Sequence, residues 1–195
     1  DHYPDALASL RADRLTLPSR TTIDSLRGLE GHAAMSYFSS WPALLGRSSF
    51  RRQARTARDP INLLLDMTYA RLAQLVTLHL LDADFDPAAG MLHVDTDDRP
   101  SLALDLMEPL RPLIADRFVL RWFRREPQAW CIETPSGKWS TTPHGRKLFR
   151  ERWSAWLYGN SDRQRRGMNA SIQSAVKGFQ SWLIDEVPID WPRVR

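Results

Sequence analysis

The sequence predicts an all-α domain with one minor β-hairpin. Apolar residues recur at helical spacing along most of the 195 residues, and short stretches rich in Pro, Gly and Asp separate these segments. Only residues 128–141 place two short apolar pieces around a Pro-Ser-Gly turn, which predicts a hairpin over about 130–132 and 138–140.

The first two helices are bounded by residues that start or break helices. Residues 5–17 predict a short helix, which a following proline ends. Thr21 or Thr22 can cap a second helix that begins at Ile23 and runs to about Trp41. Its apolar positions recur every three or four residues, so one face is expected to pack on other helices.

A long third helix is expected at the centre of the core. It follows a basic loop over residues 47–58, which contains five Arg. Asp59 is typical of an N-cap and Pro60 of a first helical residue. The helix runs to about Leu81 and is apolar on most sides. Its narrow polar stripe consists of Thr68, Arg71, Gln74 and Thr77.

The second half begins with a connector over residues 82–100, in which 91–94 predict a short extended piece. Ser101 can cap a helix that reaches about residue 125, and two further helices are expected over 144–159 and 162–185. These elements predict an N-terminal linker and helix (1–19), a helical catalytic domain (20–186) and a mobile C-terminal tail (187–195).

The charge of the chain is carried almost entirely by arginine. The formal net charge is +4 and the isoelectric point about 9.6, while Lys occurs only at 138, 147 and 177. Arginine binds phosphate bidentately and stacks on bases, so the composition suits a nucleic-acid partner. A GC-rich genome would favour arginine equally well, and composition alone leaves the two explanations even.

The single cysteine, Cys131, excludes an internal disulfide and a cysteine-based zinc site. Together with the lack of any apolar run of about 18 residues, it favours a cytoplasmic protein that does not span a membrane. The first four residues show no signal-peptide pattern and no initiator Met, so the sequence is expected to be a fragment, a processed product or part of a longer protein.

Glu30 is the first candidate for chemistry. It lies in the second predicted helix between Gly28 and Gly31, and each glycine costs that helix about 1 kcal/mol relative to alanine. The cost suggests that something approaches the backbone closely near Glu30. A solvated glutamate on an ordinary helix is the simpler alternative, and is favoured for Glu30 taken singly.

A second candidate is His93, which lies in an apolar run, where a packed, hydrogen-bonded histidine is more common than a ligand. The third candidate is the pair Asp105 and Glu108, whose spacing places both carboxylates on one helix face among apolar residues. Such carboxylates repel each other unless a cation lies between them. Pro109 and Pro112 cannot donate to the carbonyls of this turn, which predicts a kink at the pair.

Glu30, His93 and Glu108, with Asp105 beside them, form a mixed nitrogen and oxygen donor set. Such a set suits Mg²⁺ or Mn²⁺ rather than a structural zinc ion. A divalent ion of this kind polarises a phosphodiester and activates a hydroxyl nucleophile.

At these residues the sequence resembles the Cas1 family of CRISPR adaptation integrases. The similar elements occur in the family's order over about residues 20–125. They are Glu30-Gly31 with the small residues and Tyr37 that follow, Asp59-Pro60-Ile61-Asn62 with Tyr69, Gly90-Met91-Leu92-His93, and the run from Leu104 to Pro112.

The resemblance implies a metal-dependent DNA endonuclease and integrase that inserts short DNA spacers into a CRISPR array by 3′-hydroxyl transesterification. Glu30, His93 and Glu108 would be the metal ligands, and Asp105 a further catalytic residue. Asn62, Tyr69 and Arg111 would support the site or bind DNA.

It also implies partners: double-stranded DNA as prespacer and as CRISPR repeat, and the small protein Cas2 in a hetero-oligomer built from integrase homodimers. The family's N-terminal β-rich domain is absent from this sequence. A fusion to a reverse transcriptase would fit that departure.

Arginine clusters are the candidate DNA contacts, and a solvated charged face is the alternative, favoured for the last cluster. They are Arg51, Arg52, Arg55 and Arg58 in the basic loop, Arg117, Arg121, Arg124 and Arg125 after the acidic pair, and Arg163, Arg165 and Arg166 before the last helix. Five tryptophans, at 122, 139, 153, 156 and 182, are expected in the core or at a partner surface.

Two other functions compete with the CRISPR integrase. A related transposase of a mobile element would use the same site and the same chemistry on a different DNA. A non-catalytic helical DNA-binding or scaffold domain would leave the acidic residues solvated and bind no metal.

Overall fold

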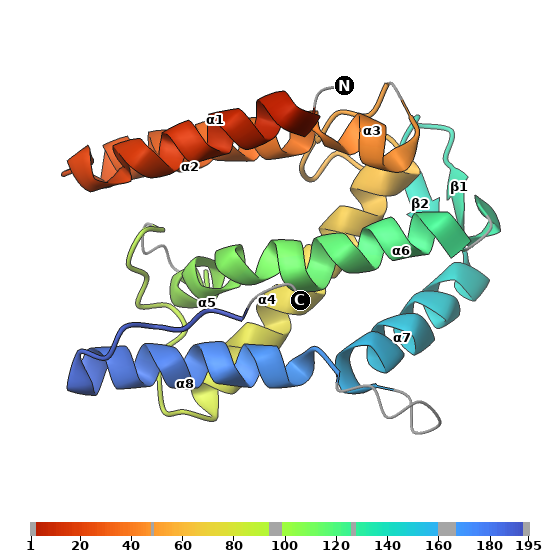
Figure 1. The fold of residues 1–195 in the computed structure, drawn as a ribbon. Helices are drawn as coiled ribbons and strands as arrows, with labels where there is room; N and C mark the ends of the chain where they lie inside the picture. The colour runs from red at the N-terminus through yellow and green to blue at the C-terminus, as the bar shows by residue number, and fades with distance from the viewer. Residues whose placement is uncertain (1–2, 48, 94–98, 126–127, 160–166, 193–195) are drawn as a thin grey trace. The chain divides into compact units, whose positions relative to one another are not determined.

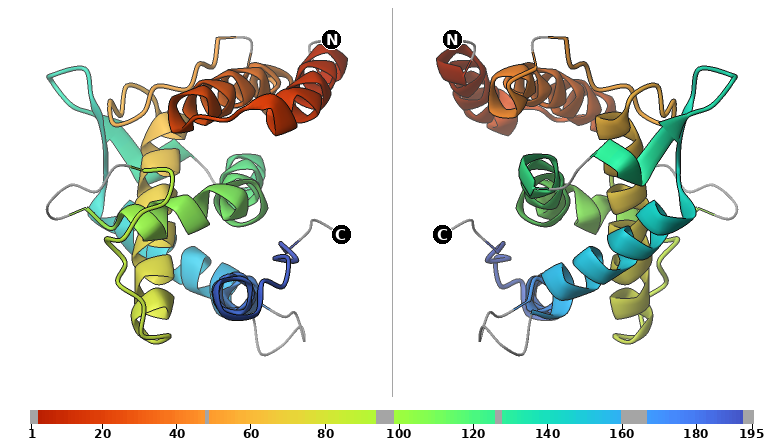
Figure 2. Two further views of the ribbon diagram at one scale, coloured as in Figure 1. Left: turned by 90° about the vertical axis from the view of Figure 1, so that its left-hand side faces the viewer. Right: turned by 90° about the vertical axis from the view of Figure 1, so that its right-hand side faces the viewer.

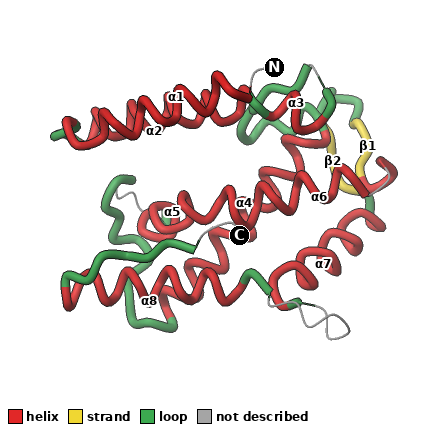
Figure 3. Tube along the Cα trace, viewed as in Figure 1, coloured by secondary structure: helices red, strands yellow, loops and turns green. Residues whose placement is uncertain are grey.

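The computed structural model describes residues 3–47, 49–93, 99–125, 128–159 and 167–192. Within these ranges the regular secondary structure is helical apart from a two-stranded antiparallel hairpin, which confirms the all-α prediction (Figures 1 and 3). The residues form two compact units, 1–53 and 54–195. None of the described helices is both long and apolar enough to cross a membrane.

The first unit is built on two helices that pack side by side, α1 (Tyr3–Thr16) and α2 (Ile23–Ser39) (Figure 1). Thr22 caps α2: its side chain accepts from the Ser25 amide, while the Ser25 hydroxyl accepts from the Thr22 amide. The helix ends at Ser39, within two residues of the expected end, and a separate short helix, α3 (Trp41–Leu45), begins at Trp41. Pro42 has no amide to continue the ladder of α2.

Polar contacts hold α1 to α2. The hydroxyls of Ser9 and Ser36 lie 2.8 Å apart, and Nδ1 of His32 lies 2.9 Å from both carboxylate oxygens of Asp13. An aromatic cluster follows Ser36 along the chain, where the rings of Tyr37, Phe38, Trp41 and Phe50 pack together.

The second unit is organised by α4 (Pro60–Leu81), which crosses the directions of α6 and α8 (Figure 2). As predicted, Asp59 is its N-cap and accepts from two backbone amides of the first turn, and Pro60 opens the helix. Thr68 departs from the predicted polar stripe because it is fully buried, with its hydroxyl bonded to the carbonyls of the preceding turn. The core residues of the helix are Ile61, Leu64, Leu65, Leu72, Val76 and Leu80.

The chain returns across α4 through an interrupted helix. This comprises α5 (Ser101–Met107), a 3₁₀ turn (Glu108–Leu110), a π-helical turn (Pro112–Asp116) and α6 (Arg117–Arg125). The regular helix therefore ends between Asp105 and Glu108, the place where the two prolines predict a kink. The predicted Ser101 cap is wrong, because Ser101 is the first helical residue and is buried.

The hairpin pairs β1 (Cys131–Glu133) with β2 (Trp139–Thr141), within one residue of the prediction, and Ile132 lies opposite Ser140. The Trp139 amide donates to the carbonyl of Ala57, which ties β2 to the loop before α4.

Two further helices complete the unit: α7 (Pro143–Tyr158) and α8 (Asn169–Asp185). The predicted start of α8 at residue 162 lies outside the described residues, and residues 167–168 are not helical. Aromatic side chains of α6 and α7 pack against one another: Phe118, Trp122, Phe149 and Trp153.

The chain reverses after α8 at Glu186, which has a φ of 56°. Residues 187–192 then turn back beside the helix (Figure 1). A Cβ placed on Gly178 would meet Cγ2 of Ile189 at 3.1 Å, so this return depends on a small residue in α8. The mobility expected for residues 187–195 stays a prediction.

Gly145→Ala should destabilise the second unit by about 2 kcal/mol or more. A Cβ at this position would lie 1.8 Å from the backbone oxygen of Trp130, so the hairpin or α7 must shift. Thermal or urea denaturation measures the loss. Ser154→Ala, on the exposed face of the same helix, is the matched control and should change stability by only a few tenths of a kcal/mol. Equal stability of the two variants would contradict the close contact.

Candidate functional site

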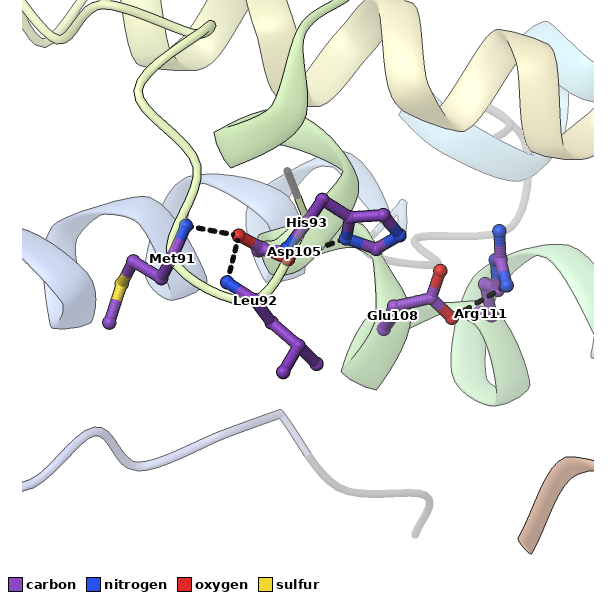
Figure 4. A network of polar contacts seen from close by, with 6 residues as sticks. All are labelled: Met91, Leu92, His93, Asp105, Glu108 and Arg111. Atoms are coloured by element: carbon purple, nitrogen blue, oxygen red, sulfur yellow. Dashed lines mark hydrogen bonds and ion pairs between the residues drawn. The ribbon is translucent and has the colours of Figure 1, made fainter. Parts of the chain in front are cut away.

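Asp105 is the centre of the polar network in the second unit (Figure 4). Its Oδ2 accepts from the backbone amides of Met91 at 2.6 Å and Leu92 at 2.9 Å. Its Oδ1 accepts from the backbone amide of His93 at 3.0 Å and contacts Nδ1 of the His93 ring at 2.5 Å. One carboxylate therefore fixes both the backbone and the side chain of the segment that carries His93.

The environment of Asp105 keeps its carboxylate ionised. Burial alone would raise the pKa, but the hydrogen bonds from the His93 side chain and from the three backbone amides outweigh it, and the pKa lies below the ordinary value. An ionised carboxylate only accepts hydrogen bonds, so Nδ1 of His93 carries a proton. In the neutral ring the lone pair is then on Nε2, the nitrogen available to a metal ion.

The segment around His93 is a bend in the chain rather than the short extended piece that was predicted. Its amides bond to the Asp105 carboxylate instead of to a neighbouring strand, which explains why residues 91–93 form no strand. Val94 lies outside the described residues.

Glu108 begins the 3₁₀ turn after α5, and its Oε2 accepts from Nη1 of Arg111 at 2.6 Å. Figure 4 shows the edge of the His93 ring that is not bound to Asp105 turned toward the Glu108 carboxylate. The two side chains are about one fifth exposed, at 21% for His93 and 23% for Glu108. The site thus presents an imidazole nitrogen and a carboxylate that solvent and ligands can reach.

Glu30 belongs to the other unit, on the exposed surface of α2. It makes no hydrogen bond or ion pair with the described part of residues 1–53. A Cβ built on Gly28 or Gly31 meets no described atom within 4 Å, so the space beside this helix is open. Its joining to His93 and Glu108 stays a prediction.

Three of the predicted DNA contacts make internal interactions. Asn62 is fully buried and its amide donates to the Asp59 carboxylate at the start of α4, so a supporting role fits its position, and its part in binding DNA stays a prediction. The Tyr69 hydroxyl donates to Asp116 at 2.6 Å. Arg111 lies over the Tyr69 ring, with its guanidinium carbon 4.5 Å from the ring centroid.

Asp116 was not anticipated from the sequence. It is 1% exposed in the last position of the π-helical turn. A lone acidic residue between Ile114-Ala115 and Phe118-Val119 is the signal that could have identified it, since a buried carboxylate requires hydrogen-bond partners.

The basic loop spans the boundary between the units. Arg51, Arg55 and Arg58 are exposed and Arg52 is half-buried. Arg55 has a φ of 62°, in the left-handed region that non-glycine residues rarely adopt, and its amide donates to the Asp66 carboxylate at 2.9 Å. The loop before α4 is therefore held in one shape by Asp66 and by β2.

Of the other two predicted basic clusters, the structure describes the one on α6 but not the one before α8. On α6, Arg124 and Arg125 are exposed, while Arg121 lies over the Trp156 ring. Arg163, Arg165 and Arg166 lie outside the described residues.

Within the described part of residues 54–195, no three His, Cys, Asp or Glu side chains gather closely enough to hold a metal ion. His93 and Glu108 nevertheless supply two of the donors that such a metal site would need. A metal-ligating histidine usually donates its second ring nitrogen to a carboxylate, as His93 does to Asp105, and a carboxylate lies on the opposite side of the ring. A third donor would have to come from elsewhere.

Comparison with known families identifies a match over most of the chain. The model of the family described as CRISPR associated protein Cas1 matches residues 1–155. A CRISPR-associated endonuclease Cas1 of Methanospirillum hungatei is 41% identical over 120 residues, which are 60% of this chain and 34% of that protein. A Cas4/Cas1 fusion of Geobacter sulfurreducens is 38% identical over 125 residues, 60% of this chain and 22% of that protein. The chain spans about a third or less of the length of these curated relatives.

Solved structures share the fold. A Cas1 protein from Thermotoga maritima superposes with a TM-score of 0.81 at 23% identity, covering 95% of this chain and 60% of that one. A casposase bound to its integration product gives a TM-score of 0.80 at 20% identity, covering 94% and 58%. A Cas6-RT-Cas1–Cas2 complex gives 0.81 at 19% identity, covering 98% and 22%.

Asp105→Asn should release the segment around His93. The asparagine amide nitrogen cannot accept, so at least one of the bonds from Met91, Leu92 and His93 is lost. We expect hydrogen exchange of these amides to accelerate about ten-fold. Glu108→Gln, which leaves the Asp105 carboxylate in place, should not alter their protection. Unchanged exchange in Asp105→Asn would contradict the anchoring role.

The stability that Asp105 contributes should depend on pH. Because folding lowers its pKa, the contribution is complete above the ordinary value of about 3.8 and is lost as the pH falls through the lower pKa of the folded state. The difference in melting temperature between the unmodified chain and Asp105→Asn should therefore be larger at pH 7 than at pH 3. A difference that does not depend on pH would be inconsistent with an ionised Asp105.

Proposed function

This chain belongs to the Cas1 family of CRISPR-associated proteins, and from that premise we propose that it is a metal-dependent DNA integrase and endonuclease that inserts short DNA spacers into a CRISPR array. The observation that carries the proposal is the His93 ring, whose Nδ1 is bound by Asp105 and whose other edge is turned toward Glu108. Curated relatives named CRISPR-associated endonucleases support the same activity.

The proposed cofactor is Mg²⁺ or Mn²⁺, held by Glu30, His93 and Glu108. When bound, the ion would supply Lewis-acid polarisation of a phosphodiester and a more acidic hydroxyl nucleophile. Imidazole nitrogen with carboxylate oxygen is a donor set that these ions accept.

Asp105 and Arg111 would orient the proposed metal ligands rather than transfer a proton. Asp105 fixes the tautomer of the neutral His93 ring, so that Nε2 is the nitrogen whose lone pair faces a ligand. Arg111 balances the charge of Glu108 with a short ion pair. In strand joining, a 3′-hydroxyl oxygen bonds to a target phosphorus as the target's own ester bond breaks. The number of phosphodiester bonds is conserved, and no external energy source is required.

The proposed partners are double-stranded DNA and a Cas2 protein, within an assembly that contains integrase homodimers. One structural neighbour is a complex that contains Cas1 and Cas2, and another carries DNA. A fused reverse transcriptase occurs in the first of these neighbours, and a similar fusion for this chain is part of the proposal. We place the activity in the cytoplasm, where a CRISPR array would be found.

A transposase of a mobile element is the second candidate, because the casposase shares this fold. The two functions would use the same residues on different DNA. Integration into plasmids with and without a CRISPR repeat separates them: a requirement for the repeat supports the adaptation integrase, and indifference to it supports the transposase.

Removal of any proposed metal ligand should abolish strand joining. Glu30→Ala, His93→Ala and Glu108→Ala are each expected to lower the rate at least about 100-fold, since even changes to outer-shell partners of a metal cost about 10- to 100-fold. The assay follows joining of a labelled short duplex to a repeat-containing plasmid, with and without Cas2. EDTA should stop the reaction and Mn²⁺ should restore it.

Glu133→Ala, at an exposed glutamate of the hairpin, is the matched control and should retain full activity. Activity that persists in all three ligand variants would refute the proposed site. A non-catalytic scaffold predicts that neither the unmodified chain nor Glu108→Ala releases or absorbs heat when titrated with Mn²⁺.

A further inference from the structure

A line of side chains connects the interior of the second unit to the proposed metal ligand Glu108. From inside outward it consists of the Asp116 carboxylate, the Tyr69 phenol, the Arg111 guanidinium and the Glu108 carboxylate. We propose that Tyr69 and Asp116 are positioning residues that hold Glu108, through Arg111, in the orientation that a divalent cation requires. This inference rests on the proposed function, and goes beyond it by assigning a role to residues that do not touch the ion.

The inner end of the line is rigid. Asp116 is 1% exposed, and a carboxylate at that depth requires hydrogen-bond donors. Tyr69 donates one such bond at 2.6 Å, from α4 to the π-helical turn. Wide turns of this kind are rare and occur frequently at functional sites. The bond fixes the plane and the reach of the Tyr69 ring.

The ring in turn orients Arg111. The guanidinium carbon lies 4.5 Å from the ring centroid, close enough for the cation to interact with the face of the ring. The buried Nε of Arg111 has no hydrogen-bond partner among the described residues. The guanidinium is therefore held by the ring on one side and by Glu108 on the other.

The outer end of the line controls one oxygen of Glu108. Nη1 of Arg111 donates to Oε2 at 2.6 Å, a charge-assisted bond with a defined direction (Figure 4). The orientation of the Glu108 carboxylate therefore depends on the direction in which the Tyr69 ring holds the Arg111 guanidinium.

The decisive variant is Tyr69→Phe in the full chain. It removes the hydroxyl that binds Asp116, keeps the ring under Arg111 and leaves every charge unchanged. We expect the Kd for Mn²⁺, measured by calorimetry, to rise about ten-fold, as is typical for outer-shell partners of a metal. Affinity for a short DNA duplex, measured by fluorescence anisotropy in EDTA, should not change. Tyr158→Phe, at an exposed tyrosine of α7, is the matched control and should alter neither value.

The outcomes separate this inference from the proposed function. An unchanged Kd for Mn²⁺ in Tyr69→Phe overturns the positioning role, and so does a loss of DNA affinity alone, which would make Tyr69 part of a DNA-binding surface. Failure of the unmodified chain to bind Mn²⁺ overturns the proposed metal site itself. If Tyr69→Phe does not fold, Arg111→Lys is the second test, because it keeps the positive charge but loses the planar guanidinium. A similar rise in the Kd for Mn²⁺ supports the proposal, and an unchanged Kd overturns it.

Discussion

The candidate site depends on one carboxylate that binds backbone and side chain together. Asp105 is fixed because α5 is packed through its buried neighbours Leu102, Ala103 and Leu106. From that position its oxygens bind the backbone amides of Met91, Leu92 and His93 and the imidazole of His93 itself. Helix packing thereby determines where a loop residue lies and which of its nitrogens can bind a ligand. Loops carry function in this way when a rigid element positions them.

Two prolines, Pro109 and Pro112, give the acidic residues Asp105 and Glu108 different contacts. On a regular helix, side chains three apart point the same way, and Asp105 and Glu108 would repel each other. Pro109 and Pro112 replace the regular turn with a 3₁₀ turn and a π-helical turn. Asp105 then binds the loop, while Glu108 faces Arg111 and the free edge of His93. The interruption converts a like-charged pair into an orienting residue and a candidate ligand.

The sequence predicts these features best where the cause is local. Asp59-Pro60 starts α4 and the two prolines break the helix after Met107, because caps and missing amides act within a few residues. Ser101 was misassigned as a cap because tertiary packing buries it. The partners of Asp105 and the burial of Thr68 and Asn62 were also missed, since they depend on which segments the fold brings into contact. The resemblance to a family supplied candidate site residues, but it could not say which of them face inward.

The internal contacts of Asn62 and Tyr69 limit which side chains could bind DNA. With Asn62 buried and the Tyr69 hydroxyl bound to Asp116, the candidate contacts that reach solvent are mainly arginines. Residues 117–158 contain nine Lys and Arg against three acidic residues, more excess charge than the whole chain carries. Arginine contacts to phosphate fix position without reading sequence. An integrase of the proposed kind must accept spacers of any sequence, and the loop around Arg55, held in shape by Asp66, suits that requirement because it offers charge in a fixed place.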